Sequence, residues 1–108
     1  MVSDLERGPT FHPGEALRED YLPDLGWTPE ELARRLRVPV ETVLEVLAER
    51  RPVTPELAMR LARLFNQSAS FWLKIQISHD LRQLKQSPMA RDVAKIEPLN
   101  SEPIRRAG

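Results

Sequence analysis

Apolar residues recur at helical spacing through most of the first 86 residues of this 108-residue chain. Pro13, Pro29 and Pro55 each open one of these stretches, and the first position of a helix tolerates proline. Thr28 and Glu31 have the spacing of a capping box. The pattern predicts five helices, at residues 13–22, 29–37, 40–49, 55–65 and 69–86. No stretch alternates convincingly with a period of two, so the predicted fold is all-α.

The apolar positions of the first four predicted helices are expected to form one core, because a chain of this length buries about one. The expected core residues are Leu17, Tyr21, Leu22, Leu32, Ala33, Leu36, Val43, Val46, Leu47, Leu57, Ala58, Leu61, Ala62 and Phe65. The predicted domain covers residues 12–86. Residues 1–11 are expected to form a flexible N-terminal arm, and residues 87–108, with three prolines, an extended or partly disordered tail. A short apolar pattern in this tail suggests docking on the body or on a partner; it consists of Val93, Ile96 and Leu99.

The last predicted helix carries apolar residues on two sides, and a domain this small has little protein to cover both. One face is therefore predicted to bury itself in the helix's own domain and the other in a second copy of the chain. The predicted homodimer interface consists of Phe71, Trp72, Ile75, Ile77, Leu81 and Leu84. The alternative is a helix sunk entirely in its own core.

Composition is that of an ordinary globular protein, with 41% hydrophobic and 30% charged residues. Cysteine is missing from the sequence, which excludes disulfides and thiolate metal sites. No apolar run resembles a signal peptide or approaches membrane-spanning length, so a cytoplasmic protein without a membrane partner is expected. Sixteen basic residues balance sixteen acidic ones, unlike the excess of a strongly basic nucleic-acid binder. The charge is uneven, however: residues 1–26 hold 2 basic and 6 acidic side chains, and residues 66–108 hold 7 and 4.

Residues 28–51 have the pattern of a helix-turn-helix. The helical segment TPEELARRL is followed by a short turn, Arg37-Val38-Pro39, and by a second helical segment, VETVLEVLAE. The apolar spacing suits two helices packed at a steep angle and leaves positions 40, 41, 44 and 45 pointing outward. Many helical hairpins share such a pattern, so it does not by itself identify a DNA reader.

Longer segments carry a more specific resemblance. HPGEALREDYL, ELARRLRVP and VTPELAMRLARLFNQSASFWLKIQ, in this order, resemble the HigA-type antitoxins of bacterial toxin–antitoxin pairs. These belong to the lambda-repressor-like (XRE) helix-turn-helix class, and the match runs from about His12 to Leu81, with weaker similarity at KIEPL. The resemblance implies a five-helix bundle that dimerises through its last helix. It also implies binding to a RelE-like, HigB-type toxin that cleaves RNA, and repression of its own operon at a palindromic operator.

The predicted recognition helix departs from the family's usual sequence, in which Ser, Arg, Asn or Gln often occupy the outward positions. Carboxylates face phosphates unfavourably, although Glu can accept a hydrogen bond from cytosine N4. Phosphate contacts are expected from arginines that flank the helix. The predicted DNA-binding residues are Val40, Glu41, Thr42, Leu44 and Glu45 on the helix and Arg34, Arg35, Arg37, Arg50 and Arg51 beside it. The alternative is that the arginines are merely surface charge, since Arg34, Arg37, Arg60 and Arg63 have glutamates within helical reach.

Catalytic, metal and cofactor sites have no residue support. His79 and Asp80 are adjacent, but no further histidine or paired carboxylates accompany them, and a solvated helix histidine is the simpler interpretation. Neither a phosphate-cradling glycine loop nor zinc-ligand spacing occurs in the sequence. We therefore predict a protein that is not an enzyme and needs no cofactor.

Three functions fit the sequence. The first is an antitoxin that neutralises a toxin and represses its operon. The second is an antitoxin or dimer scaffold with little DNA affinity, and the third is a free-standing XRE-type transcription regulator without a toxin. In the first two functions, the acidic N-terminal segment would suit a basic RNA-cleaving toxin through charge complementarity. The predicted toxin contacts are Glu15, Glu19 and Asp20.

Overall fold

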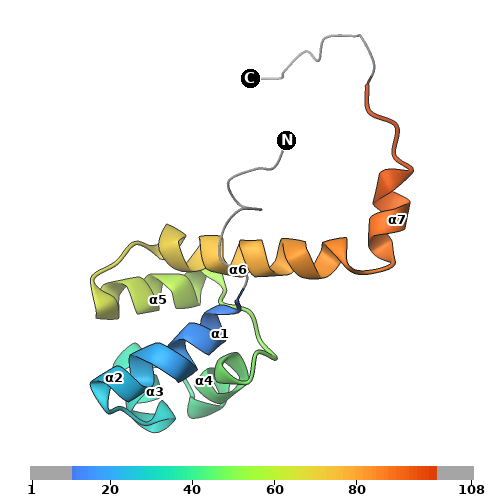
Figure 1. The fold of residues 1–108 in the computed structure, drawn as a ribbon. Coiled ribbons are helices and arrows are strands. Elements are labelled where there is room, and N and C mark those ends of the chain that lie inside the picture. Colours follow the sequence, from blue (N-terminus) through green and yellow to red (C-terminus); the bar gives the residue numbers. More distant parts are fainter. Residues whose placement is uncertain (1–10, 100–108) are drawn as a thin grey trace.

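The computed structural model describes residues 11–99, and all the regular secondary structure in this range is helical (Figure 1). The elements are α1 (Pro13–Ala16), η1 (Leu17–Tyr21), α2 (Leu22–Leu25), α3 (Pro29–Leu36), α4 (Val40–Leu47), α5 (Pro55–Phe65), α6 (Ala69–Lys85) and α7 (Met89–Ala94). The first three run on as one helical segment, which corresponds to the helix predicted at 13–22. The all-α prediction and all five predicted helices are confirmed. The predicted flexible arm falls almost wholly on residues 1–10, outside the described residues.

The predicted extended tail is wrong for Met89–Ala94, which forms α7. Pro88 does not block this helix, because it stands at the N-cap position, where no N–H is needed.

The turn η1 also differs from the predicted α-helix, because it is π-helical: the N–H of Leu22 donates to Leu17 O. Pro23 follows directly and has no N–H to donate, so the hydrogen-bond ladder is already interrupted where the wider turn occurs.

Side-chain caps fix where the helices begin, as the sequence predicted for Thr28. Thr28 Oγ1 accepts a hydrogen bond from the N–H of Glu31 at 3.1 Å, and Ser68 Oγ accepts one from the N–H of Phe71 at 3.2 Å. Each satisfies an N–H that has no partner within its helix. At the other ends, Arg37 and Asn66 adopt left-handed backbone conformations that stop α3 and α5.

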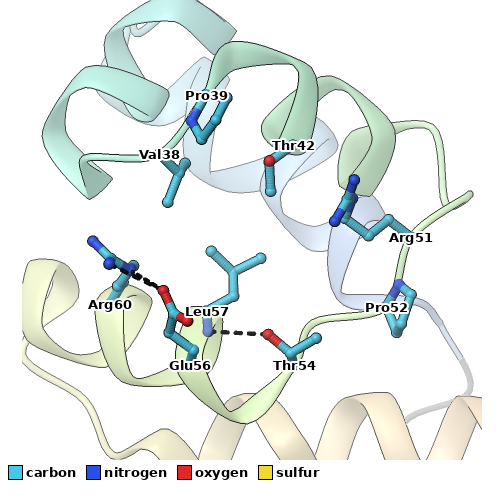
Figure 2. Close-up of a pocket in the computed structure, with 9 residues that line it drawn as sticks. All are labelled: Val38, Pro39, Thr42, Arg51, Pro52, Thr54, Glu56, Leu57 and Arg60. Atoms are coloured by element: carbon cyan, nitrogen blue, oxygen red, sulfur yellow. Dashed lines mark hydrogen bonds and ion pairs between the residues drawn. The ribbon is translucent and has the colours of Figure 1, made fainter.

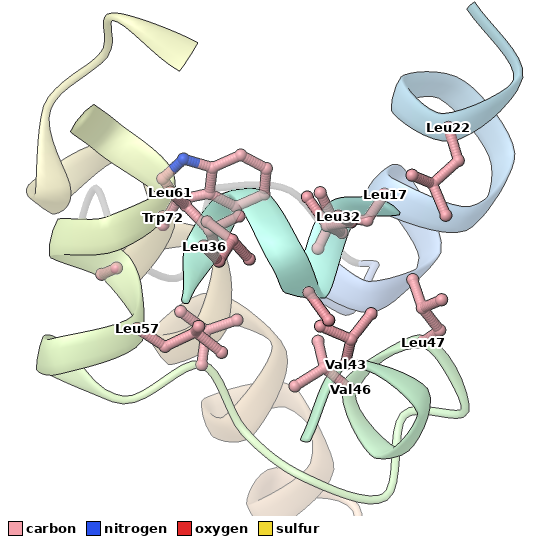
Figure 3. Packing of buried hydrophobic residues seen from close by; sticks show 13 residues of the cluster. Leu17, Leu22, Leu32, Leu36, Val43, Val46, Leu47, Leu57, Leu61 and Trp72 are labelled. Atoms are coloured by element: carbon pink, nitrogen blue, oxygen red, sulfur yellow. The ribbon is translucent and has the colours of Figure 1, made fainter. Parts of the chain in front are cut away.

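One hydrophobic core joins η1, α2, α3, α4, α5 and the first half of α6 (Figure 3). The predicted core residues are confirmed as buried or packed against it. Trp72, a member of this core, is 0% exposed. Its indole Nε1 donates to Gln67 Oε1 at 2.8 Å, and Gln67 Nε2 donates to the Tyr21 hydroxyl at 2.8 Å. The buried indole N–H is thereby satisfied, and the start of α6 is held to the end of η1.

The segment HPGE holds the first helix against α4. His12 caps α1 through Nδ1, which accepts from the N–H of Gly14 at 2.9 Å. A Cβ atom on Gly14 would lie 1.8 Å from the carbonyl oxygen of Val46, so only glycine allows this approach. His12 itself is buried. Burial, assisted by the nearby ring of His79, lowers the pKa of His12 below its usual value.

The second half of α6 extends past the bundle and carries α7 at its far end (Figure 1). Two of the predicted dimer residues are corrected here: Trp72 and Ile75 are buried in the protomer's own core and have no surface left for a partner. Ile77 and Leu84, in contrast, are 41% and 44% exposed. None of the helices in the described part of the chain is long and apolar enough to cross a membrane.

Candidate nucleic-acid interface

Helices α3 and α4 form the predicted helix-turn-helix. Arg37 adopts a left-handed backbone conformation with a φ of 60°. The N–H of Val38 donates to Ala33 O at 3.1 Å, which closes the end of α3. Leu36 and Val43 pack between the two helices. The N-terminus of α4 follows directly, with Pro39 as an N-cap that offers no side-chain hydrogen bond. The first backbone N–H groups of α4 therefore have no capping side chain, and such groups are suited to hydrogen-bond an acceptor from outside.

The outward face of α4 agrees with the prediction for two of its four positions. Glu41 and Leu44 are exposed, Leu44 at 44%. Val40 and Glu45 are half-buried, and Val40 packs against the core. Thr42 is also half-buried. No basic residue occurs within Val40–Leu47, so any positive charge that supports α4 on DNA must come from neighbouring segments.

Glu45 is paired with Arg51, which the sequence did not indicate. Arg51 Nε and Nη2 both donate to Glu45 Oε1, at 2.8 Å and 2.5 Å. This contact, in which two guanidinium N–H groups share one carboxylate oxygen, crosses the turn after α4 and neutralises one of the two carboxylates of α4. Glu41 and Arg50 form no ion pair with any residue in 11–99.

The arginines of α3 are held on their own helix. Glu31 accepts hydrogen bonds from both Arg34 and Arg35, and these two partners lower its carboxyl pKa. Arg35 also stacks over the indole of Trp27, with its guanidinium carbon 4.2 Å from the ring centre. Both arginines stay exposed. Glu31 therefore does not complete the capping box predicted with Thr28, since its carboxylate is used by the arginines.

A hollow opens between the start of α4 and the start of α5 (Figure 2). Its lining residues are Val38, Pro39, Thr42, Arg51, Pro52, Thr54, Glu56, Leu57 and Arg60. Arg60 binds Glu56 and donates from Nη1 to the carbonyl oxygen of Leu36 at 2.9 Å. It therefore ties α5 to the last turn of α3, beside the recognition helix. Sequence reasoning missed Arg60 as part of this surface, and its spacing from Glu56 indicated only an ordinary helix pair.

The end of α4 is positioned by Arg18, a second residue that sequence reasoning missed. Arg18 Nη1 donates to Leu47 O at 2.6 Å and to Glu49 Oε2 at 3.2 Å. Glu49 has a φ of 61°, and the N–H of Arg50 donates to Glu45 O at 2.9 Å. The backbone contacts close α4 with a Schellman motif, and Arg18 attaches the carbonyl of Leu47 to the first helical segment.

The predicted toxin contacts all lie on the exposed side of the first helical segment. Glu15, Glu19 and Asp20 are solvent-exposed, and Glu19 accepts a hydrogen bond from Arg18. Asp20 lines a separate hollow between η1, α2 and α5. The other lining residues of this hollow are Tyr21, Asp24, Leu25, Phe65 and Gln67. In the part of the chain that the structure describes, no three His, Cys, Asp or Glu residues are grouped to hold a metal ion.

Comparison with known proteins identifies the family of this fold. Residues 16–72 match the family model for the helix-turn-helix. The chain belongs to this helix-turn-helix family. It is 36% identical over 94 residues to virulence-associated protein I of Dichelobacter nodosus, and the matched stretch covers 87% of this chain and 85% of that protein.

Solved structures of antitoxins share the fold. The Pseudomonas aeruginosa antitoxin HigA with the higBA promoter is 35% identical, with a TM-score of 0.78 over 85% of this chain and 100% of that one. The antitoxin GraA in complex with its operator is 33% identical, with a TM-score of 0.78 over 87% of this chain and 95% of that one. The resemblance to HigA-type antitoxins is thus confirmed, and the chain is a helix-turn-helix protein of the antitoxin and transcription-regulator type.

Proposed function

We propose that this chain is an antitoxin that binds and neutralises a RelE-like RNA-cleaving toxin and represses its own operon as a DNA-bound dimer. The observation that carries the DNA part is α4 itself, whose N-terminus has no capping side chain and whose C-terminal end is fixed in place by Gly14 and Arg18. Similarity to two antitoxins solved with promoter or operator DNA, over at least 85% of this chain, supports it.

In the proposed complex, α4 enters the major groove, as the second helix of a helix-turn-helix does. The side chains nearest the bases are Val40, Glu41, Thr42, Leu44 and Glu45, as the sequence predicted. Glu41 accepts a hydrogen bond from a cytosine N4 amino group, and the methyl groups of Val40 and Thr42 contact thymine. Arg50 binds a backbone phosphate. Arg51 remains on Glu45, so we assign it a role in holding that carboxylate rather than in phosphate binding.

The proposed dimer uses the half of α6 that extends past the bundle. Ile77 and Leu84 are exposed on it, Leu81 is half-buried between them, and Phe71 is exposed nearer its start. The apolar surface continues onto α7, where Met89 and Val93 are exposed and no residue is buried. A six-residue helix is too short to be stable by itself in water, so a covering partner would explain its formation. Two copies would place their recognition helices roughly 34 Å apart, one turn of DNA.

The proposed toxin surface is the acidic side of the first helical segment. Glu15, Glu19 and Asp20 would attract a basic RNA-binding partner. Asp20 is the strongest candidate, because the hollow it lines pairs two carboxylates with the aromatic rings of Tyr21 and Phe65. Carboxylates beside aromatic faces suit an arginine or lysine side chain.

A mobility-shift titration tests the proposal. The probe is the DNA upstream of this gene, and the titration is run with and without the product of the adjacent toxin-sized reading frame. We expect binding at low salt by a dimer and a changed shift when the toxin is added. If no promoter complex forms at low salt but the toxin is still neutralised, the chain is an antitoxin without DNA-reading function. The unpaired carboxylate of Glu41 on α4 is the observation that favours this second candidate function. If no adjacent toxin exists, the toxin part of the proposal is wrong.

A further inference from the structure

The recognition helix of this chain lacks the positive charge that a DNA-binding helix ordinarily uses. The only charged residues of α4 are Glu41 and Glu45. Glu45 forms an ion pair with Arg51, so the positive charge of Arg51 is already neutralised. Phosphate neutralisation supplies much of the affinity of a protein for DNA. The cations that supply it must therefore stand elsewhere on the molecule, close enough to α4 to contact the strands that border the major groove.

Arginines gather in a shallow hollow between the end of α3 and the middle of α5, which we name the arginine hollow. Its lining residues are Arg35, Leu36, Arg37, Arg60, Arg63 and Leu64. Four of these six residues are arginines. Two of the four are paired with a carboxylate: Arg35 with Glu31 and Arg60 with Glu56. Two positive charges of the hollow are thus left without a counter-charge.

The uncompensated charges belong to Arg37 and Arg63. Arg35 is bound to Glu31 and stacked on Trp27, and Arg60 is bound to Glu56 and to main-chain oxygen. Within residues 11–99, the side chains of Arg37 and Arg63 form neither an ion pair nor a hydrogen bond, and both residues are exposed. Two guanidinium groups beside one hollow present forked donors with the geometry that phosphate oxygens accept.

The arginine hollow adjoins the reading surface. Arg37 stands three residues before Val40, the first residue of α4. Arg60 lines both the arginine hollow and the hollow beside Pro39 and Thr42 in Figure 2, so the two hollows adjoin each other near the N-terminal end of α4. A DNA strand that borders a groove occupied by α4 passes this end of the helix.

We propose that the arginine hollow binds the phosphate backbone of DNA, with Arg37 and Arg63 as its two phosphate ligands. Arg35 and Arg60, which are paired with Glu31 and Glu56, form the walls of the hollow. This inference rests on the proposed DNA-binding function and deepens it. It assigns the main electrostatic anchor to Arg37 and Arg63, which lie outside α4, and so explains how an acidic recognition helix can be held on DNA.

The test measures binding of the full chain to fluorescent duplexes by anisotropy, from about 50 to about 200 mM salt. One duplex carries the DNA upstream of this gene, and the other has the same bases in shuffled order. The test variant combines Arg37→Gln and Arg63→Gln. The matched control combines Lys74→Gln and Arg91→Gln, two exposed cations on α6 and α7 that leave the same net charge. A third variant, Arg37→Lys with Arg63→Lys, keeps the charge and loses the fork.

We expect the Arg37→Gln, Arg63→Gln variant to flatten the slope of log K against log salt by about 0.9 for each lost contact, or about 1.8 for each protomer. The effect should be equal on both duplexes, because phosphate contacts carry no sequence information. The lysine variant should keep the wild-type slope and bind more weakly, and the control should match wild type. A slope for the glutamine variant equal to that of the control overturns the inference while wild-type binding stands. Wild-type protein that binds neither duplex at low salt overturns the proposed DNA-binding function itself.

Discussion

Substitution of Gly14 by alanine should destabilise the fold, although alanine is the better helix former. At an exposed helical site the exchange is favourable by about 1 kcal/mol. Here the new Cβ would lie 1.8 Å from Val46 O and 2.8 Å from Val46 C. The nearer contact must lengthen by about 1.2 Å to reach even the 3.0 Å that real Cβ atoms respect. Because the obstacle is backbone, no rotamer change relieves it, and α1 must move away from α4.

Overpacking of this kind costs up to about 3 kcal/mol, so after the gain in helix propensity we expect a net loss of about 2 kcal/mol. Urea denaturation followed by circular dichroism measures the unfolding free energy, and Glu15→Ala, one residue further along the same helix and exposed, is the control. DNA affinity should fall as well, because the displaced α1 no longer holds α4. A Gly14→Ala protein as stable as the control would refute the reasoning that this close backbone contact sets the position of the recognition helix.

Three further changes have expected outcomes. Glu49→Gly should raise the unfolding free energy by about 0.5–1 kcal/mol in the same urea assay, because glycine adopts a φ of 61° without strain. The exposed ion pair of Glu49 with Arg18, which this change removes, contributes little, and a loss of stability would contradict the prediction. For His12, whose pKa is lowered on folding, the unfolded chain takes up the proton first, so stability should fall as the pH drops below about 6.5 and not change above it. His12→Asn keeps a capping oxygen but cannot titrate, and an undiminished pH dependence between about pH 7.5 and 5.5 would contradict the assignment of this dependence to His12. Glu41→Gln should strengthen binding to shuffled DNA at low salt by removing repulsion from phosphates, and unchanged anisotropy would place α4 away from DNA.

Local signals in the sequence were sufficient to predict the helices and their starts. Thr28, Thr54 and Ser68 each cap the helix that follows them, and capping depends only on a side-chain oxygen within three residues of an N–H group. The apolar spacing of α3, α4 and α5 likewise predicted the buried residues, because each of these helices packs one face on a common core.

Features that depend on distant parts of the chain were not predictable. Trp72 lies on an apolar face that the sequence offered to a partner, but Gln67 and Tyr21 draw it into the protomer's core. The pairing of Arg51 with Glu45 required the chain to turn back after α4, which the left-handed Glu49 allows and which no residue preference indicates. The position of Arg60 beside α4 depends in the same way on how α5 crosses the end of α3.

The segments that carry the family resemblance are those that build the scaffold. In HPGE, His12 caps the first helix and Gly14 admits the carbonyl of Val46. In the segment from Ser68 to Gln76, the serine starts α6, and Gln76 Oε1 accepts the N–H of Val53 at 2.7 Å, which holds the chain after the recognition helix. These contacts fix the placement of α4 without using its outward side chains. The outward face can therefore change in sequence while the fold persists. Likeness to the antitoxins thus predicts how this chain presents α4, and in the proposed complex the choice of bases would depend on Glu41 and its neighbours.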